Sequence, residues 1–173
     1  IRCLEPLPDS ELVSILLQVV QGLKFEPYLT SPLVLFLVRR ASLSRNLIGH
    51  TLFWHLYSEI HNEPLSLMNS ILLTTLQQLF PSFFNDLLAQ TQLVSQLGEV
   101  AKAVRNIGTR SRTAHARSLL SAIQINGTLT LPVNPSFCVR SLIVEKCKVM
   151  VSLTIFSGIM RIVFEKGTSV PGF

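Results

Sequence analysis

The sequence predicts a mainly α-helical protein, in which stacked helical hairpins of an armadillo-like α-solenoid precede a short, incomplete β segment. Three observations support this fold class. Apolar residues recur at helical spacing through residues 1–126. Prolines separate these periodic segments at short intervals, which is typical of antiparallel helix pairs. Beyond Gly127 the helical spacing gives way to β-branched residues and further prolines, which favour strands.

Each helix is predicted from apolar residues at helical spacing and from capping or helix-breaking residues at its ends. The first has Asp9 or Ser10 as N-cap and Gly22 near its end. Ser31 followed by Pro32 is a cap with proline at the first helical position, and this second helix should end near Ser44. The apolar lines of the remaining four helices run through residues 48–60, 68–79, 87–104 and 116–123.

The stretch HTLFWHLYSEIH, residues 50–61, contains three histidines and could be interpreted as a metal site or as packing. His50, His55 and His61 are five and six residues apart, so they do not share a helix face as an i, i+4 pair of zinc ligands does. Two neighbouring rows of apolar residues run along this helix, which predicts burial on two sides. We therefore expect the helix to pack in the core and not to bind a metal ion. His55 and Glu59, at i and i+4, should make a local hydrogen bond or contact the next helix.

The C-terminal part is predicted as a linker over residues 127–136, strands over 137–167 and an unstructured tail over 168–173. Its most apolar stretch, Val149 to Phe164, is shorter than the roughly 20 residues that cross a bilayer and includes Arg161. A single membrane span is therefore the weaker interpretation. Two strands around a turn at Ser157-Gly158 fit the β-branched composition better.

Composition narrows the classes of function. Hydrophobic residues make up 48% and charged residues 14%, against roughly 25% charged in an average soluble domain, so some apolar surface should need a partner. The net charge is +5, and the basic residues are scattered except between Lys102 and Arg117, so we expect no nucleic-acid partner. Cys3, Cys138 and Cys147 are odd in number and lack C-x-x-C spacing, which favours reduced thiols and a cytoplasmic location.

Catalytic patterns are not evident in the sequence. It has no serine-nucleophile elbow, no glycine-rich phosphate loop and no carboxylate cluster that could hold magnesium. The chain begins at Ile1 rather than Met, which indicates a piece of a longer polypeptide. From the residues alone we expect a helical interaction scaffold.

Three stretches resemble successive landmarks of class I phosphoinositide 3-kinase catalytic subunits. They are LLQVVQGLKFEPYL (16–29), RNLIGHTLFWHLYSEIH (45–61) and NPSFCVRSLIVEKCKVM (134–150), and IRCLE at residues 1–5 is similar to the sequence that precedes them in the family. The resemblance implies that residues 1–126 are the C-terminal portion of the helical (PIK) domain and that residues 137–167 begin the kinase N-lobe. It also implies structural roles for Trp54, His55 and Glu59.

The resemblance further implies an activity for the intact protein. Members of the family phosphorylate the inositol 3-hydroxyl of phosphoinositides, using ATP and magnesium, and are recruited from the cytoplasm to membranes. The implied partners are the remaining domains of the parent kinase, with a regulatory subunit as a further possibility. The membrane phosphoinositide would be reached only through the rest of the kinase domain.

This chain departs from the family near its nucleotide-binding strands. Glu165 stands where the family places the lysine that contacts ATP, and Lys166 and Ser152 are weak substitutes for the family's phosphate-contacting groups. The D-R-H-x-x-N and D-F-G sequences of the family are not among the 173 residues. We therefore assign no catalytic residue, no metal ligand and no cofactor to this chain, and we expect it to be inactive alone.

Two hypotheses follow from the resemblance and the departures. The first is a scaffold fragment of a phosphatidylinositol 3-kinase catalytic subunit. The second is a free-standing helical adaptor derived from such a kinase by truncation.

Overall fold

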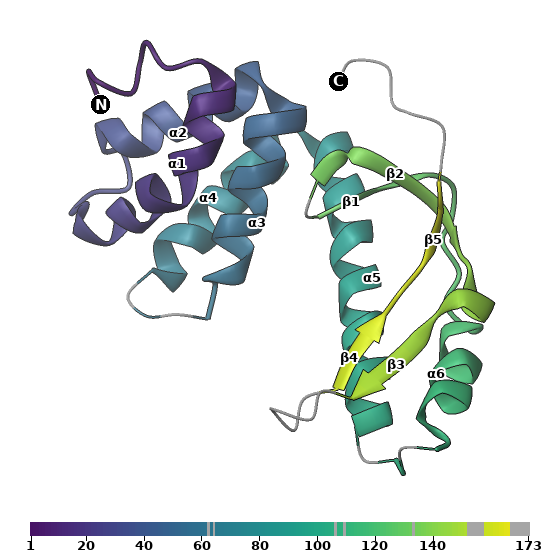
Figure 1. Cartoon of the computed structure of the whole chain (residues 1–173). Helices are drawn as coiled ribbons and strands as arrows, with labels where there is room; N and C mark the ends of the chain where they lie inside the picture. Colours follow the sequence, from purple (N-terminus) through teal and green to yellow (C-terminus); the bar gives the residue numbers. More distant parts are fainter. Residues whose placement is uncertain are drawn as a thin grey trace. The chain divides into compact units, whose positions relative to one another are not determined.

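The computed structural model describes residues 1–61, 63, 65–105, 107–108, 110–132, 134–151 and 158–166, and it has the predicted mainly α-helical fold followed by a short β segment (Figure 1). The helices are α1 (Asp9–Gln21), α2 (Pro32–Leu43), α3 (His50–Ser58), α4 (Ser66–Leu79), α5 (Pro81–Arg105) and α6 (Arg112–Leu120). The strands are β1 (Leu129–Leu131), β2 (Asn134–Leu142), β3 (Lys148–Val151), β4 (Gly158–Arg161) and β5 (Phe164–Lys166). Short 3-10 turns cover Gly22–Phe25 and Val144–Lys146.

The chain forms two compact units, residues 1–87 and residues 88–173. The division falls within α5, whose first two turns belong to the first unit and whose remainder belongs to the second. Each unit has its own buried apolar side chains, one cluster in the first unit and two in the second.

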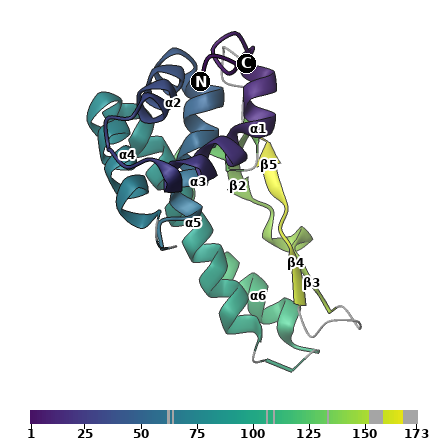
Figure 2. The ribbon, with the colours of Figure 1, turned by 90° about the vertical axis from the view of Figure 1, so that its left-hand side faces the viewer.

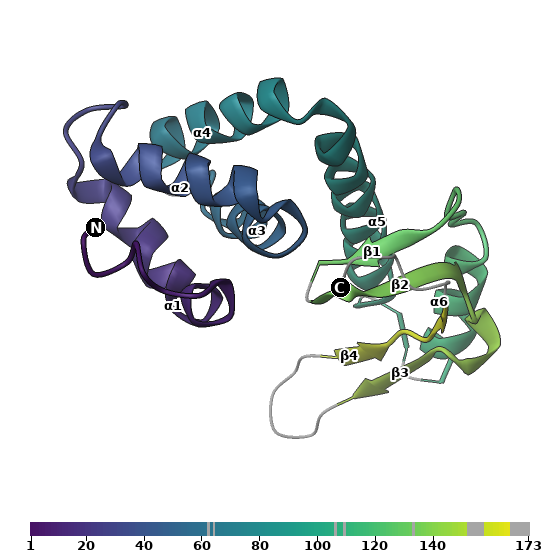
Figure 3. The same cartoon turned by 90° about the horizontal axis from the view of Figure 1, so that it is seen from above.

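The first unit is built from α1 to α4 and the start of α5, which surround one apolar core (Figure 3). Helix α1 contributes Leu12, Leu16 and Val20, spaced four residues apart on one face, and all three are fully buried. Helices α1 and α4 each pack against α3, and α2 packs against both α3 and α4. The repeated i, i+4 spacing seen in the sequence is therefore the core-facing stripe of each helix.

Local signals fix the helix ends in the first unit. The Val34 N–H donates to Ser31 Oγ at 3.3 Å, and Pro32 is the first residue of α2, as predicted. The predicted cap of α1 was wrong: Pro8 occupies the N-cap position without a side-chain hydrogen bond, and Asp9 is already helical. Pro8 has an extended backbone conformation, so the helix begins one residue later, at Asp9. Asp9 and Glu11 therefore lie in the first turn, where their negative charges interact favourably with the positive end of the helix dipole.

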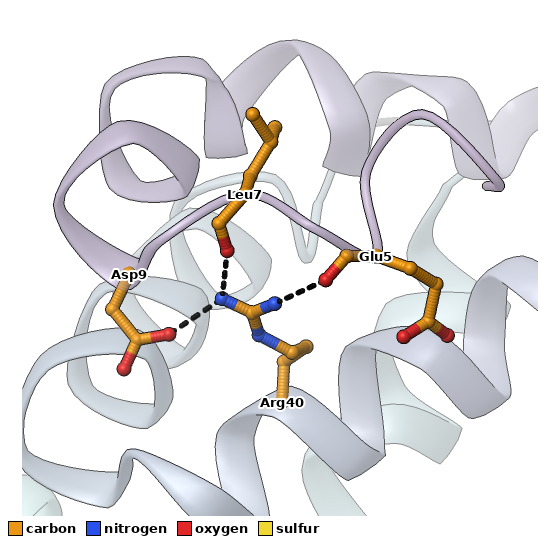
Figure 4. Close-up of polar contacts among 4 residues, drawn as sticks. All are labelled: Glu5, Leu7, Asp9 and Arg40. Atoms are coloured by element: carbon orange, nitrogen blue, oxygen red, sulfur yellow. Dashed lines mark hydrogen bonds and ion pairs between the residues drawn. The ribbon is translucent and has the colours of Figure 1, made fainter.

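Arg40 on α2 ties the N-terminal segment to the helical core (Figure 4). Its guanidinium donates to the carbonyl oxygens of Glu5 at 3.3 Å and Leu7 at 2.8 Å, and to Asp9 Oδ1 at 2.6 Å. The Arg40 side chain is largely buried, at 12% exposed, so these bonds are shielded from water on most sides. The neighbouring Arg39 instead makes a single exposed contact of 3.7 Å with Glu5.

The second unit contains a three-stranded antiparallel sheet in the order β1-β2-β5 and a two-stranded antiparallel sheet of β3 and β4. The two sheets form one interrupted ribbon, because the Ile143 N–H donates to Val163 O at 2.8 Å between the β2–β5 and β3–β4 pairs. The two strands predicted within the apolar stretch are present as β3 and β4, but the predicted turn position was wrong at Gly158, which is the first residue of β4 and pairs with Val151; Ser157 lies outside the described residues.

The segment 127–136, predicted as an extended linker, contains β1 and the first residues of β2, which pair with each other. Leu129 is buried with Val139 and with Leu93 of α5, so the segment joins a core instead of spanning solvent. Leu129 and Leu131 alternate along β1 and pack on the same apolar cluster, which explains why this segment forms a strand instead of the predicted linker. The predicted tail, 168–173, lies outside the described residues.

The core of the second unit lies between the C-terminal half of α5, α6 and the ribbon. Val100 and Val104 of α5 are buried with Ala116 and Leu120 of α6 and with Cys147. Helix α6 also covers the outer edge of β3, because the Val149 N–H donates to Thr113 Oγ1 at 3.4 Å and Arg117 Nε donates to Cys147 O at 3.1 Å. Side chains of α6 thus satisfy backbone groups that an uncovered strand edge would present to solvent.

We predict that replacing Arg40 with Ala lowers the free energy of unfolding by about 1.5–3 kcal/mol, because charge-assisted hydrogen bonds to three partly buried acceptors are lost. The matched control is Arg39→Ala, whose exposed ion pair should cost roughly 0–1 kcal/mol. Urea denaturation followed by circular dichroism measures both changes. Equal effects of the two substitutions would contradict the anchoring role of Arg40.

Candidate functional site

The histidine-containing helix α3 is the first candidate site. It begins after a π-helical turn, Arg45–Gly49, in which the Gly49 N–H donates to Ser44 O at 2.9 Å. A Cβ at Gly49 would lie 3.4 Å from the Ala41 carbonyl oxygen, so the small residue permits close packing of this turn on α2. The apolar spacing of this stretch predicts an uninterrupted helix and gives no signal for the extra residue that the π-helical turn inserts.

The three histidines of this stretch lie in different surroundings. His50 is buried at the start of α3, His55 is half-buried on the helix, and His61 is exposed beyond the helix end at Ser58. Within the described residues, no three His, Cys, Asp or Glu side chains lie close enough together to hold a metal ion. Burial lowers the pKa of His55 below its ordinary value of 6.5, because removal of water disfavours the imidazolium ion.

Packing dominates α3. Ile48, Leu52, Phe53 and Leu56 are all at most 1% exposed. The Phe53 ring meets Trp54 and Phe84 edge-on, with centroid distances of 5.4 and 5.3 Å, and stacks with Tyr57 at 5.6 Å. These are the separations and orientations that aromatic pairs prefer. The burial on two sides predicted for this helix is therefore present, and the aromatic residues serve the core.

The end of α3 is held by α4. Asn69 of α4 is fully buried, and its Nδ2 donates to the backbone oxygen of Leu56 at 3.4 Å. This bond satisfies one of the carbonyl groups that a helix leaves unpaired at its C-terminal end. The Asn69 contact was not predicted, because the sequence separation of 13 residues gives no local signal for it.

The candidate nucleotide-contacting residues lie on β5, next to β2. Glu165 stands opposite Ser141 and Lys166 opposite Val139. Ser141 Oγ donates to Glu165 Oε2 at 2.6 Å, and the side chains of Glu165 and Lys166 are both exposed. The structure therefore brings Glu165 and Lys166 to the edge of one sheet. Ser152, the third candidate, lies outside the described residues.

An open depression with a volume of about 350 Å³ lies beside Ser141. Its polar lining comes from Arg140, Ser141, Gln124, Asn126 and Ser121, and its floor is apolar. No carboxylate belongs to the described lining, so the depression lacks the groups that most commonly bind magnesium in proteins. No sequence signal predicts this depression, because it forms where the residues after α6 meet β2.

Comparison with known proteins identifies the family. Residues 1–89 match the model of the phosphoinositide 3-kinase family, accessory domain (PIK domain). This chain belongs to that family. The match covers α1 to α4 and the start of α5, which are the elements of the first unit.

Relatives from Dictyostelium discoideum extend the similarity into the second unit. The chain is 38% identical over 150 residues to phosphatidylinositol 3-kinase 1, 35% over 151 residues to phosphatidylinositol 3-kinase 2 and 31% over 156 residues to phosphatidylinositol 3-kinase 3. Each match covers 87% of this chain but only 10%, 8% and 9% of the respective relative. The chain thus spans about a tenth of the length of the kinases that it matches.

The described part of this PIK-domain chain has no helix long and apolar enough to cross a membrane. The apolar stretch that raised the membrane interpretation, Val149 to Phe164, instead contains β3, β4 and the start of β5 where it is described.

We predict that Phe53→Ala lowers the free energy of unfolding of the PIK unit by about 3–5 kcal/mol, because it removes a fully buried ring from three aromatic neighbours. The matched control is His61→Ala, an exposed position in the same stretch that should change stability by less than about 0.5 kcal/mol. Chemical denaturation measures both. A large effect of His61→Ala that depends on added zinc would support the metal interpretation instead.

We also predict that His55 makes stability depend on pH. The pKa of His55 in the folded state lies below the unfolded value of 6.5, so between these two pKa values the unfolded chain binds more protons than the folded chain. The contribution of His55 to the free energy of unfolding is therefore fully present above pH 6.5 and is lost as the pH falls below 6.5. His55→Gln should reduce the loss of stability between neutral and mildly acidic pH, whereas His61→Gln should not. Denaturation curves at the two pH values test this, and identical pH dependence of the His55 variant and the parent chain would contradict it.

Proposed function

We propose that this chain serves as a scaffold within a phosphatidylinositol 3-kinase catalytic chain and does not itself bind ATP or transfer phosphate. The observation that carries the proposal is the use of the family's characteristic helix for packing. Leu52, Phe53 and Leu56 are buried on α3, with α1, α2 and α4 around them. A helix committed to the core in this way supports other elements and offers no side chain for chemistry at those positions.

Exposed apolar residues supply a surface for the proposed scaffold role. Phe25, Tyr28 and Leu29 follow one another in the connection between α1 and α2 and are 78%, 72% and 46% exposed. Three large apolar side chains exposed within five residues are typical of a contact surface. We assign this connection to contacts with other domains of the parent kinase, and a regulatory subunit is a further partner that the family suggests.

For the parent protein we propose ATP- and magnesium-dependent phosphorylation of the inositol 3-hydroxyl of phosphoinositides. The relatives are named phosphatidylinositol 3-kinases, which supports this activity for the longer protein. We further propose that residues 1–126 form the C-terminal portion of the helical domain, that 127–136 connect it, and that 137–167 begin the kinase N-lobe. A cytoplasmic location with recruitment to membranes fits this activity.

The contacts of Glu165 support the proposal that this chain does not bind nucleotide. A carboxylate at the position assigned to the family's ATP-contacting lysine repels phosphate groups instead of attracting them. Glu165 already accepts a hydrogen bond from Ser141 Oγ, so this carboxylate is engaged within the sheet. Transfer of a phosphoryl group also requires magnesium ligands and a group that positions the acceptor hydroxyl, and we assign neither to this chain.

We predict no change in melting temperature when the chain is titrated with millimolar magnesium-ATP, and no phosphoinositide product above background from purified chain. Differential scanning fluorimetry and a lipid-kinase assay measure these outcomes. The informative variant is Lys166→Ala, with the exposed Lys148→Ala as its matched control. A saturable thermal shift that Lys166→Ala abolishes and Lys148→Ala preserves would overturn the proposal, because it would place the nucleotide contact at Lys166.

A further inference from the structure

The second half of α2 contains the sequence Arg39-Arg40-Ala41-Ser42. Two arginines placed three and two residues before a serine form the pattern that basophilic protein kinases recognise. These enzymes phosphorylate serine or threonine next to basic residues, because carboxylates in their substrate groove pair with the guanidinium groups. Neither the two arginines nor Ser42 belongs to the buried apolar core of the first unit, so the pattern is not explained by packing alone.

The folded chain does not present this pattern to a protein kinase. The Arg39 side chain is 68% exposed, but the Arg40 side chain is bound to three acceptors in the N-terminal segment, as Figure 4 shows. Residues two positions apart in a helix do not face the same side, so Arg40 and Ser42 point in different directions. An acidic groove therefore cannot contact both arginines and the serine while α2 is intact.

The hydroxyl group of Ser42 is also engaged in the folded chain. Ser42 is half-buried in the last turn of α2, and its Oγ donates to the Val38 carbonyl oxygen at 2.7 Å. A hydroxyl that accepts a phosphoryl group must be placed in line with the leaving oxygen. The end of α2 must therefore unwind before Ser42 can react.

The N-terminal segment controls this unwinding. It lies beside α2 and is joined to it by the Arg40 bonds (Figure 2). Helix α2 ends at Leu43, one residue after Ser42, so only its last turns have to open once Arg40 is released. The ends of helices open at a lower free energy than the centre of a core does.

We propose that Ser42 is a cryptic phosphorylation site, which a basophilic protein kinase reaches only when the N-terminal segment releases Arg40. The protein kinase supplies ATP and magnesium. Ser42 Oγ attacks the γ-phosphorus of ATP, the bond from that phosphorus to the oxygen of ADP breaks, and the hydroxyl proton passes to a carboxylate of the protein kinase. The products are phosphoserine and ADP.

Phosphorylation of Ser42 favours the released state over the anchored one. The ester oxygen of phosphoserine has no proton, so the hydrogen bond to the Val38 carbonyl oxygen is lost. The phosphate carries a charge of about −1.5 to −2 and lies in the last turn of α2, where it is repelled by the negative end of the helix dipole. The Arg40 anchor and the modification therefore oppose each other.

The first test compares the full 173-residue chain with a synthetic peptide of residues 36–46. Both are incubated with cyclic-AMP-dependent protein kinase and magnesium-ATP, and mass spectrometry measures the rate at which phosphate appears on Ser42. We expect the chain to react at least about 100-fold more slowly than the peptide, because its rate follows the small population of open molecules. In Ser42→Ala versions of both, the phosphate at this position should disappear.

The second test weakens the anchor without altering the recognised sequence. Asp9→Ala removes the carboxylate that accepts from Arg40 at 2.6 Å, so the rate at Ser42 should rise about 10-fold. The matched control is Glu11→Ala, which removes a carboxylate from the same first turn of α1. Among the described residues the Arg40 side chain bonds to residues 5, 7 and 9, so the control should stay within about threefold of the parent chain.

Several outcomes would overturn the proposal: a peptide that is not phosphorylated, a folded chain that reacts as fast as the peptide, or equal rates for Asp9→Ala and Glu11→Ala. Phosphate found only at residues other than Ser42 would overturn it as well. Circular dichroism checks the fold of each variant, and the comparison of the unmodified chain with the peptide decides the matter if Asp9→Ala does not fold.

The phosphorylated chain supplies an independent measurement. Its melting temperature should be lower than that of the unmodified chain, since the phosphate disfavours the end of α2. An unchanged melting temperature would contradict the opposition between the anchor and the modification. The chain acts only as a substrate in these assays, so their failure is distinguishable from failure of the proposed scaffold function.

Discussion

Burial of α3 on two sides is the constraint on which the first unit depends. Ile48 and Leu52 on one line and Phe53 and Leu56 on the other are withdrawn from water, so the helix must be enclosed by neighbours. Helices α1, α2 and α4 provide that enclosure, and Phe84 of α5 closes it with an edge-on contact to Phe53. Burial of an apolar side chain of this size contributes roughly 1.5–3 kcal/mol, so these four residues, Ile48 in the π-helical turn and the other three on α3, decide how the neighbouring helices pack.

This constraint also explains why a histidine-rich sequence is compatible with a structural role. His50 is buried where the π-turn meets α3, and His55 is half-buried. For His55, burial lowers the pKa and so favours the neutral imidazole, which tolerates an apolar environment better than a charged ring does. Arginine side chains anchor backbone segments in both units: Arg40 holds the N-terminal segment in the first unit, and Arg117 donates to the Cys147 carbonyl oxygen in the second.

Residues next to the helix ends were sufficient to predict where most helices begin or end. The Ser31-Pro32 cap, the stop near Ser44 and the break at Pro81 are each encoded by residues next to the boundary, and the structure places helix ends there. The start of α1 was misplaced because proline, aspartate and serine at residues 8–10 all favour a helix start, and the choice among them depends on the preceding chain that Arg40 holds.

Contacts between distant residues could not be predicted. Arg40 reaches residues more than thirty positions earlier in the chain, and Ser141 meets Glu165 only because β2 and β5 pair as neighbouring strands, with a register shift between Val139 and Ser141. The pairing of β1 with β2 was missed for the same reason: burial of Leu129 depends on Leu93 of α5. The resemblance to the kinase family supplied the position of Glu165 in the family pattern, and the structure supplied its hydrogen bond.

The central claim is that the RNLIGHTLFWHLYSEIH segment is the core of a PIK scaffold and not a binding or metal site. Hydrogen–deuterium exchange of the intact chain tests it most directly. The account predicts that amides of α3 are among the slowest to exchange in residues 1–87, and that neither zinc nor magnesium-ATP alters their rates. Fast exchange throughout α3, or protection of α3 that appears only with zinc or magnesium-ATP, would contradict it.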